Sequence, residues 1–209
     1  MSQRAAEDYD RQVFINCPFD EEYLPMLRAI VFGIHACGCK ARCALEVVDA
    51  GEVRLSKILR LIRSCRFGLH DISRTDLDDV NGLPRFNMPL ELGLFLGAAY
   101  FGPADQRRKR TLILDIERYR YQKFVSDIAG QDIKSHRNDP SAVIGIVRDW
   151  MNAAHVGTPL PGGKALAKQY RRFMAEVPPK LLKFKLHESE VSFVDWQRLV
   201  QEWLENAAE

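Results

Sequence analysis

Short apolar segments alternate with longer amphipathic segments along the first 115 residues, and this alternation restricts the fold more than any other feature of the sequence. Four runs have the length and the β-branched, aromatic or leucine-rich composition of buried strands: 12–16, 40–45, 66–72 and 111–115. Three segments between them carry apolar residues at three- and four-residue spacing, as on one face of a helix: 21–36, 52–64 and 88–100. This order predicts parallel strands joined by right-handed crossovers.

The region after residue 116 is predicted to be mainly helical. The expected helices are 141–154, 164–176 and 194–206. Pro178 and Pro179 are expected to end the second of them, and residues 181–186 to form a late strand or a loop. We therefore expect an α/β fold: a flavodoxin-like doubly wound parallel sheet of four to five strands in residues 1–135. Residues 136–209 are expected to be a helical C-terminal extension packed on the same core.

Charge and hydropathy argue against several classes of protein. The 30 basic and 28 acidic residues leave a formal charge of +2, which gives no global attraction to nucleic acid. The dense basic run 107–110 directly precedes a predicted strand, so we interpret it as a solvated loop. No segment approaches the roughly 20 apolar residues that cross a bilayer, and residues 1–10 lack the apolar core of a signal peptide. We expect a cytoplasmic protein that binds neither membrane nor nucleic acid.

The five cysteines predict reduced thiols, because their number is odd and no secretion signal is recognised. Cys37, Cys39 and Cys43 lie close together, but their spacing differs from the paired ligands of common zinc sites. We therefore expect buried or half-buried free thiols, with no metal and no cofactor.

Polar residues follow each predicted strand at the edge where open parallel sheets bind ligands. The candidates are Asn16, Phe19 and Asp20 after the first strand, Glu46 after the second, Asp71 and Arg74 after the third, and Asn87 and Glu91 at the start of the next helix. Some have a structural alternative: Asn87 as an N-cap, Glu91 as a carboxylate favoured by the helix dipole, and Asp71 as a residue that ends its strand. His70 is expected to face away from this crevice, into the packing.

The run Asn87-Met88-Pro89-Leu90-Glu91-Leu92-Gly93 follows a strand that ends in Asp71, and it resembles the active-site motif of nucleoside 2-deoxyribosyltransferases and of related TIR-like domains. The run Phe14-Ile15-Asn16-Cys17-Pro18-Phe19-Asp20 is similar to the first sequence box of TIR domains. Residues 46–52, with the helix that follows them, also suit this superfamily. The resemblance covers roughly residues 12–116.

This resemblance implies cleavage or transfer at an N-glycosidic bond of NAD or of a related nucleotide or nucleoside. Departure of the base leaves an oxocarbenium-like centre, which the carboxylate of Glu91 would stabilise or attack. Asp71 would contact or protonate the base, Asn16 and Phe19 would line the ribose and base, and Arg74 would hold phosphate. Asp20, Glu46 and Asn87 complete the expected substrate-binding set.

The resemblance also implies a homo-oligomer and an effector role in bacterial defence. Deoxyribosyltransferases usually carry a second acidic residue shortly before the glutamate, where this chain has Arg85 and Asn87. A lone carboxylate suits the alternative, a TIR-like module that senses a nucleotide or self-associates without catalysis.

Overall fold

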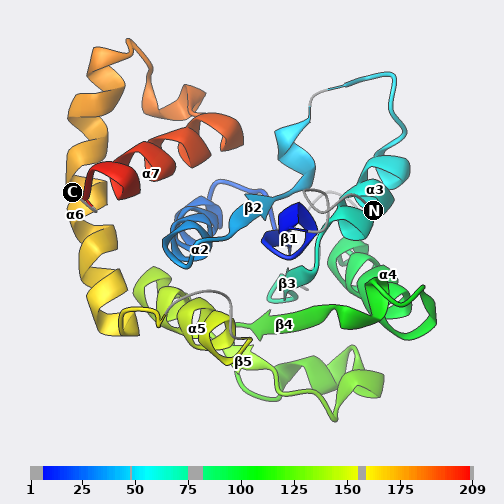
Figure 1. Cartoon of the computed structure of the whole chain (residues 1–209). Helices are drawn as coiled ribbons and strands as arrows, with labels where there is room; N and C mark the ends of the chain where they lie inside the picture. Colours follow the sequence, from blue (N-terminus) through cyan, green and yellow to red (C-terminus); the bar gives the residue numbers. More distant parts are fainter. Residues whose placement is uncertain (1–6, 48, 75–81, 155–158, 208–209) are drawn as a thin grey trace.

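A five-stranded parallel sheet lies at the centre of the computed structural model, which describes residues 7–47, 49–74, 82–154 and 159–207 (Figure 1). The strand order is β2-β1-β3-β4-β5. The strands are β1 (Gln12–Asn16), β2 (Lys40–Arg42), β3 (Phe67–Asp71), β4 (Arg110–Asp115) and β5 (Lys134–Ser135). This order is that of flavodoxin-like sheets, so the predicted fold class is confirmed.

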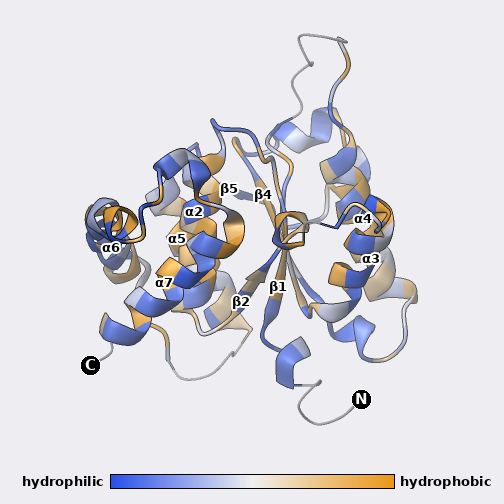
Figure 2. Ribbon diagram, turned by 90° about the horizontal axis from the view of Figure 1, so that it is seen from above, coloured by the Kyte–Doolittle hydropathy of each residue, from blue (hydrophilic) through white to orange (hydrophobic). Residues whose placement is uncertain are grey.

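Helices cover both faces of the sheet (Figure 2). On one face lie α2 (Leu24–Ala36) and α5 (Pro140–Ala153), and on the other α3 (Arg54–Ser64) and α4 (Asn87–Phe101). Two further helices, α6 (Gly163–Lys183) and α7 (Phe193–Ala207), pack outside α2 and α5. Short 3-10 turns are found at Ala44–Glu46, Gln106–Arg108, Arg120–Lys123, Ser126–Ile128 and Glu188–Glu190.

The outer helices share one hydrophobic core with the sheet and α2. Phe32 of α2 packs its ring against Phe173 of α6 and Trp203 of α7. Trp196 belongs to the same cluster and is buried, as is Trp203. The helical C-terminal region therefore extends the layer on this face of the sheet.

Close packing between β3 and α4 fixes the second helix layer. A Cβ atom on Gly68 would lie 2.6 Å from the ring of Phe95 and 2.7 Å from Nε2 of His70, so only glycine fits there without displacing the helix. Phe95 joins Phe14 and Leu61 in the core on this face. Since Glu91 stands one helical turn before Phe95, this contact orients it toward the sheet.

The prediction that Pro178 and Pro179 end a helix is wrong, because α6 runs through both prolines to Lys183. A proline inside a helix removes one backbone hydrogen bond and costs about 3 kcal/mol. Val177 and Leu181, on the buried face of the same helix, belong to the core, and their burial offsets this cost.

Other boundaries differ less. The second strand ends at Arg42 because the chain turns into the 3-10 turn Ala44–Glu46. None of the helices in the described ranges is long and apolar enough to cross a membrane. All five cysteines are buried and free, as predicted.

Candidate functional site at the carboxyl edge of the sheet

The carboxyl ends of β1 and β3 form the point at which the strand order of this sheet reverses. The two strands are neighbours, with Asn16 in register with His70. The helix after β1 covers one face of the sheet and the helix after β3 covers the other. Ligands of doubly wound sheets bind at this point, and the ends of both strands supply predicted site residues, Asn16 and Asp71.

Asn16 connects the end of β1 to the start of α4. Its Nδ2 donates a hydrogen bond of 2.8 Å to the backbone carbonyl of Met88 and contacts Nδ1 of His70 at 3.0 Å. The side chain of Asn16 is buried. In this arrangement Nδ2 of Asn16 positions α4, and the ribose contact implied by the resemblance stays a prediction.

His70 is a packed, neutral histidine, as expected. Its ring makes edge contacts with Phe14 and Phe95. Burial lowers the pKa of His70 to about 3, and the charge of Lys109 adds to this effect. The imidazole therefore carries no charge at neutral pH and does not serve as an acid or base there.

Asp71 is fully buried, and groups from three segments surround its carboxylate. The hydroxyl of Tyr23 donates a hydrogen bond to Oδ2, and the backbone N–H of Ser73 donates one of 2.8 Å to Oδ1. Nε2 of His136 lies 3.1 Å from Oδ2. With no exposed surface, Asp71 cannot contact or protonate a base in this conformation. Instead it joins the loop before α2, the end of β3 and the turn after β5.

His136 is a further residue at this edge, and the sequence did not predict it. The backbone N–H of Asn138 donates a hydrogen bond of 3.0 Å to Nδ1, and Nε2 faces Oδ2 of Asp71 at 3.1 Å. The ring is fully buried. The only sequence signal for His136 is that it follows a strand, and that strand is two residues long.

Glu91 is a buried carboxyl group without a protein partner in the part of the chain that the structure describes. It is only 8% exposed. Burial raises its pKa to about 7, against a smaller opposing effect of Arg54. The helix dipole favours carboxylates in the first turn of a helix. Glu91 is the fifth residue of α4 and lies beyond that turn. The dipole alone therefore does not account for it.

Cys17 lies close to both carboxyl groups. Burial raises the pKa of its thiol well above the usual value, and the charges of Cys43, Asp71 and Glu91 raise it further. The Cys17 thiol is therefore protonated and unreactive. Cys17, directly after β1, is thus close enough to Asp71 and Glu91 for both carboxyl groups to shift its pKa.

Three other predicted residues form ion pairs. Asp20 accepts a hydrogen bond from the backbone of Tyr23 and lies 3.3 Å from Arg74. Arg74 also pairs with the exposed Glu22. Glu46 accepts a hydrogen bond of 2.9 Å from Nε of Arg42, so it is a structural partner of that arginine.

Two predicted residues are exposed. The interpretation of Asn87 as an N-cap is wrong, because α4 begins at Asn87 and Phe86 occupies the cap position. Asn87 therefore leaves its side chain open to solvent, at the helix end beside Glu91. Phe19 is 36% exposed and offers part of its ring on the loop after β1.

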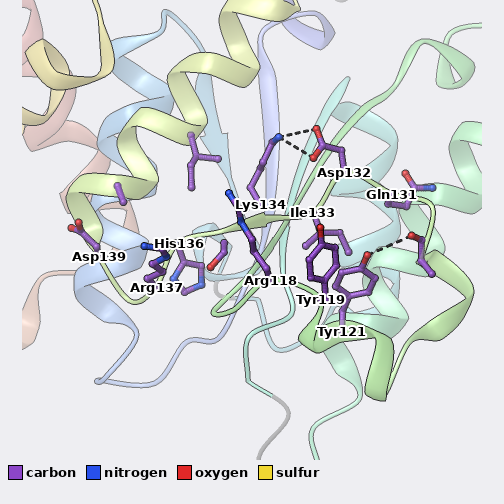
Figure 3. Close-up of a pocket in the computed structure, with 14 residues that line it drawn as sticks. Arg118, Tyr119, Tyr121, Gln131, Asp132, Ile133, Lys134, His136, Arg137 and Asp139 are labelled. Atoms are coloured by element: carbon purple, nitrogen blue, oxygen red, sulfur yellow. Dashed lines mark hydrogen bonds and ion pairs between the residues drawn. The ribbon is translucent and has the colours of Figure 1, made fainter.

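Two pockets flank the Asp71 network. A pocket of about 300 Å³ lies between the loops after β3 and β4 and is lined by Tyr23, Ser73 and Arg74, among others. A second pocket, of about 790 Å³, lies beyond β4 and β5 and includes His136 in its wall (Figure 3). Glu91 lines neither of them.

Comparison with models of known protein families and with curated proteins found no match to this chain. Among the described residues, no group of three or more His, Cys, Asp or Glu side chains is arranged to hold a metal ion.

Proposed function

We propose that this protein is an enzyme that cleaves the N-glycosidic bond of NAD or of a related nucleotide, with Glu91 acting at the anomeric carbon. One observation supports this above the others: Glu91 is buried at the ligand-binding edge of a doubly wound sheet, and no described group neutralises it. A buried carboxyl without a partner destabilises the fold. Such groups with strongly shifted pKa values cluster at functional sites.

The burial of Asp71 bears on which substrate suits the site. Ordinary nucleosides need an acid to protonate the departing base, and Asp71 is enclosed by Tyr23, Ser73 and His136. NAD needs no such acid, since its nicotinamide ring is cationic and leaves as a neutral molecule. A lone carboxylate is therefore sufficient for NAD, which we favour over uncharged nucleosides.

In the proposed reaction the bond between the anomeric carbon and the nicotinamide nitrogen breaks, and its electron pair goes to nicotinamide. The ionised carboxylate of Glu91 stabilises the positive charge left on the ribose, or bonds to it transiently. Water then adds to the anomeric carbon and releases a proton. The products are nicotinamide, ADP-ribose and that proton. The positive charge of the substrate favours the ionised form of Glu91 on binding.

The test is release of free base from NAD and from a panel of nucleosides and nucleotides, followed by chromatography. Wild type is compared with Glu91→Gln and with Glu205→Gln, an exposed glutamate of α7 that serves as the matched control. Several protein concentrations are used, because we also propose that the active form is a homo-oligomer. We expect Glu91→Gln to lose at least 100-fold in rate and the control to lose nothing. Base release that is unaffected by Glu91→Gln, or absent at every concentration, would contradict the proposal.

A role as an effector in bacterial defence is part of this proposal, since hydrolysis of NAD removes a cofactor that the host cell needs. Expression of the wild-type chain in a bacterium should lower cellular NAD once the enzyme is active. Expression of Glu91→Gln to the same level should not. If the purified wild type releases base from NAD but cellular NAD is equal with both proteins, the defence role alone would be contradicted.

A second candidate is a module that senses a nucleotide or self-associates without turnover. It is favoured by the enclosure of Asp71, which leaves the site without a second acid. Calorimetry that finds tight binding of NAD with no base release would support this function over catalysis. Light scattering with and without NAD would then show whether binding changes the assembly state.

A further inference from the structure

The pocket of about 790 Å³ beyond β4 and β5 is lined by cationic and aromatic side chains (Figure 3). We propose that it binds a nucleoside polyphosphate, with Arg118, Lys134 and Arg137 on the phosphates and Tyr119 against the base. This site is separate from the chemistry proposed for Glu91, which does not line the pocket.

The pocket carries cationic groups that the protein leaves available. Arg118 and Arg137 are exposed, and neither makes an ion pair or a side-chain hydrogen bond within the described residues. In the view of Figure 3, Arg118 lies between Lys134 on one side and Arg137 on the other. Guanidinium groups bind phosphate oxygens in pairs of parallel hydrogen bonds. The arrangement therefore suits a chain of phosphates.

The two carboxylates in the wall do not neutralise these arginines. Asp132 pairs with Lys134 at 2.7 Å, but its side chain is 84% exposed, so a phosphate can displace it at little cost. Asp139 caps α5 by accepting a hydrogen bond of 2.8 Å from the backbone N–H of Ser141. The pocket wall thus carries more cationic than anionic side chains, which favours anions.

The backbone holds these side chains in an uncommon conformation. Tyr119 and Arg137 have φ angles of 65° and 52°, a left-handed region that bulky residues rarely adopt. Two hydrogen bonds hold the turn at Arg137. The backbone N–H of Arg137 donates to the carbonyl of Ile116, and the N–H of Asn138 donates to Nδ1 of the buried His136. The backbone at Arg137 is therefore fixed before any ligand arrives, which lowers the cost of binding.

The shape of the pocket suits a nucleotide more than phosphate alone. Its volume falls in the range typical of small-molecule sites, about 300–1,000 Å³. Tyr119 is 67% exposed and belongs to the pocket wall, so its ring is available for stacking on a base. The pocket runs along the edge strand β5, and part of its wall comes from residues that follow the carboxyl ends of β4 and β5.

The experiment is calorimetric titration of the full chain with ATP, inorganic triphosphate and adenosine. We expect ATP to bind most tightly, triphosphate more weakly and adenosine not measurably. The double variant Arg118→Ala/Arg137→Ala should weaken ATP binding at least tenfold. The matched control, Arg171→Ala/Arg198→Ala, removes two exposed arginines from α6 and α7 and should bind ATP as wild type does.

A third variant tests the stacking residue without straining the fold. Tyr119→Asn removes the ring, and asparagine tolerates the left-handed backbone at this position. ATP should then bind no more tightly than triphosphate. Glu91→Gln should bind ATP as wild type does, which separates this result from the glycosidase assay. The proposal is overturned if wild type binds no ATP, if the Arg118/Arg137 variant binds it equally well, or if adenosine binds as tightly as ATP.

Discussion

The side-chain amide of Asn16 donates a hydrogen bond to the backbone carbonyl of Met88, with the two atoms 2.8 Å apart. This bond ties the last residue of β1 to the second residue of α4, three positions before Glu91. The position of the proposed catalytic carboxylate therefore depends on a buried amide in the neighbouring strand.

Replacing Asn16 with alanine should loosen the start of α4. The variant loses the hydrogen bond to Met88 and the contact with His70, which together should lower the free energy of unfolding by about 1–3 kcal/mol. Urea denaturation measures this change. Base release from NAD should fall at least tenfold, because Glu91 is displaced. An unchanged rate in a folded variant would show that α4 is held in place by other contacts.

Tyr23 and Asp71 should be energetically coupled, because the hydroxyl of Tyr23 donates to a fully buried carboxylate. A double-mutant cycle of Tyr23→Phe and Asp71→Asn should give a coupling free energy of about 1–3 kcal/mol in urea denaturation. Tyr100→Phe, on an exposed tyrosine of α4, is the control and should change stability by less than about 0.5 kcal/mol. Additive effects of the two buried substitutions would contradict the coupling.

Glu91→Gln should stabilise the protein at pH 8. Burial raises the pKa of Glu91 from 4.5 to about 7, so the folded state holds the proton more tightly than the unfolded chain. Between these two values the unfolded chain loses the proton first, and stability falls as pH rises. Above pH 7 the ionised group lowers the free energy of unfolding by on the order of 3 kcal/mol. The neutral glutamine has no such cost.

The comparison is made by urea denaturation of wild type, Glu91→Gln and Glu205→Gln at pH 5 and at pH 8. The stabilisation by Glu91→Gln should appear at pH 8 and nearly vanish at pH 5. Glu205→Gln should differ little from wild type at either pH. A Glu91→Gln variant that is no more stable than wild type at pH 8 would mean that the carboxylate has a stabilising partner.

Replacing Pro178 and Pro179 with alanine should strengthen α6. Both positions are exposed and lie inside the helix, so alanine restores backbone hydrogen bonds without changing the core. We expect a gain of about 1–3 kcal/mol in the free energy of unfolding, with no effect on base release. Thermal denaturation followed by circular dichroism measures it. A loss of stability would show that the prolines maintain a bend that the packing of Val177 and Leu181 requires.

The sequence was sufficient for the first four strands and their parallel order, because short strand-like segments alternate with longer helical segments as far as β4. It was insufficient for β5, since Lys134 and Ser135 are too few to form a recognisable pattern. It also misplaced the end of α6, because the local effect of two prolines was outweighed by burial of Val177 and Leu181.

For the site, the strand-end rule correctly brought Asn16 and Asp71 to one edge of the sheet, but it could not show what their side chains contact. The partners of Asp71 come from residues 48 positions earlier and 65 positions later, Tyr23 and His136. Contacts at such separations leave no periodic signal in a single sequence. The cationic pocket is of the same kind, because it brings Arg118 and Arg137 into one wall from separate loops. The left-handed backbone of Tyr119 and Arg137 is not predicted by their residue types.

The pH dependence of nicotinamide release from NAD by wild type and Glu91→Gln tests the central claim most directly, because kcat/KM reports the ionisation of the free enzyme. We predict that kcat/KM of wild type rises with pH to a plateau, with a midpoint near pH 7, as Glu91 ionises. Glu91→Gln should remain at least 100-fold lower, with no such rise. Equal profiles for the two proteins would contradict the assignment of Glu91 as the catalytic carboxylate.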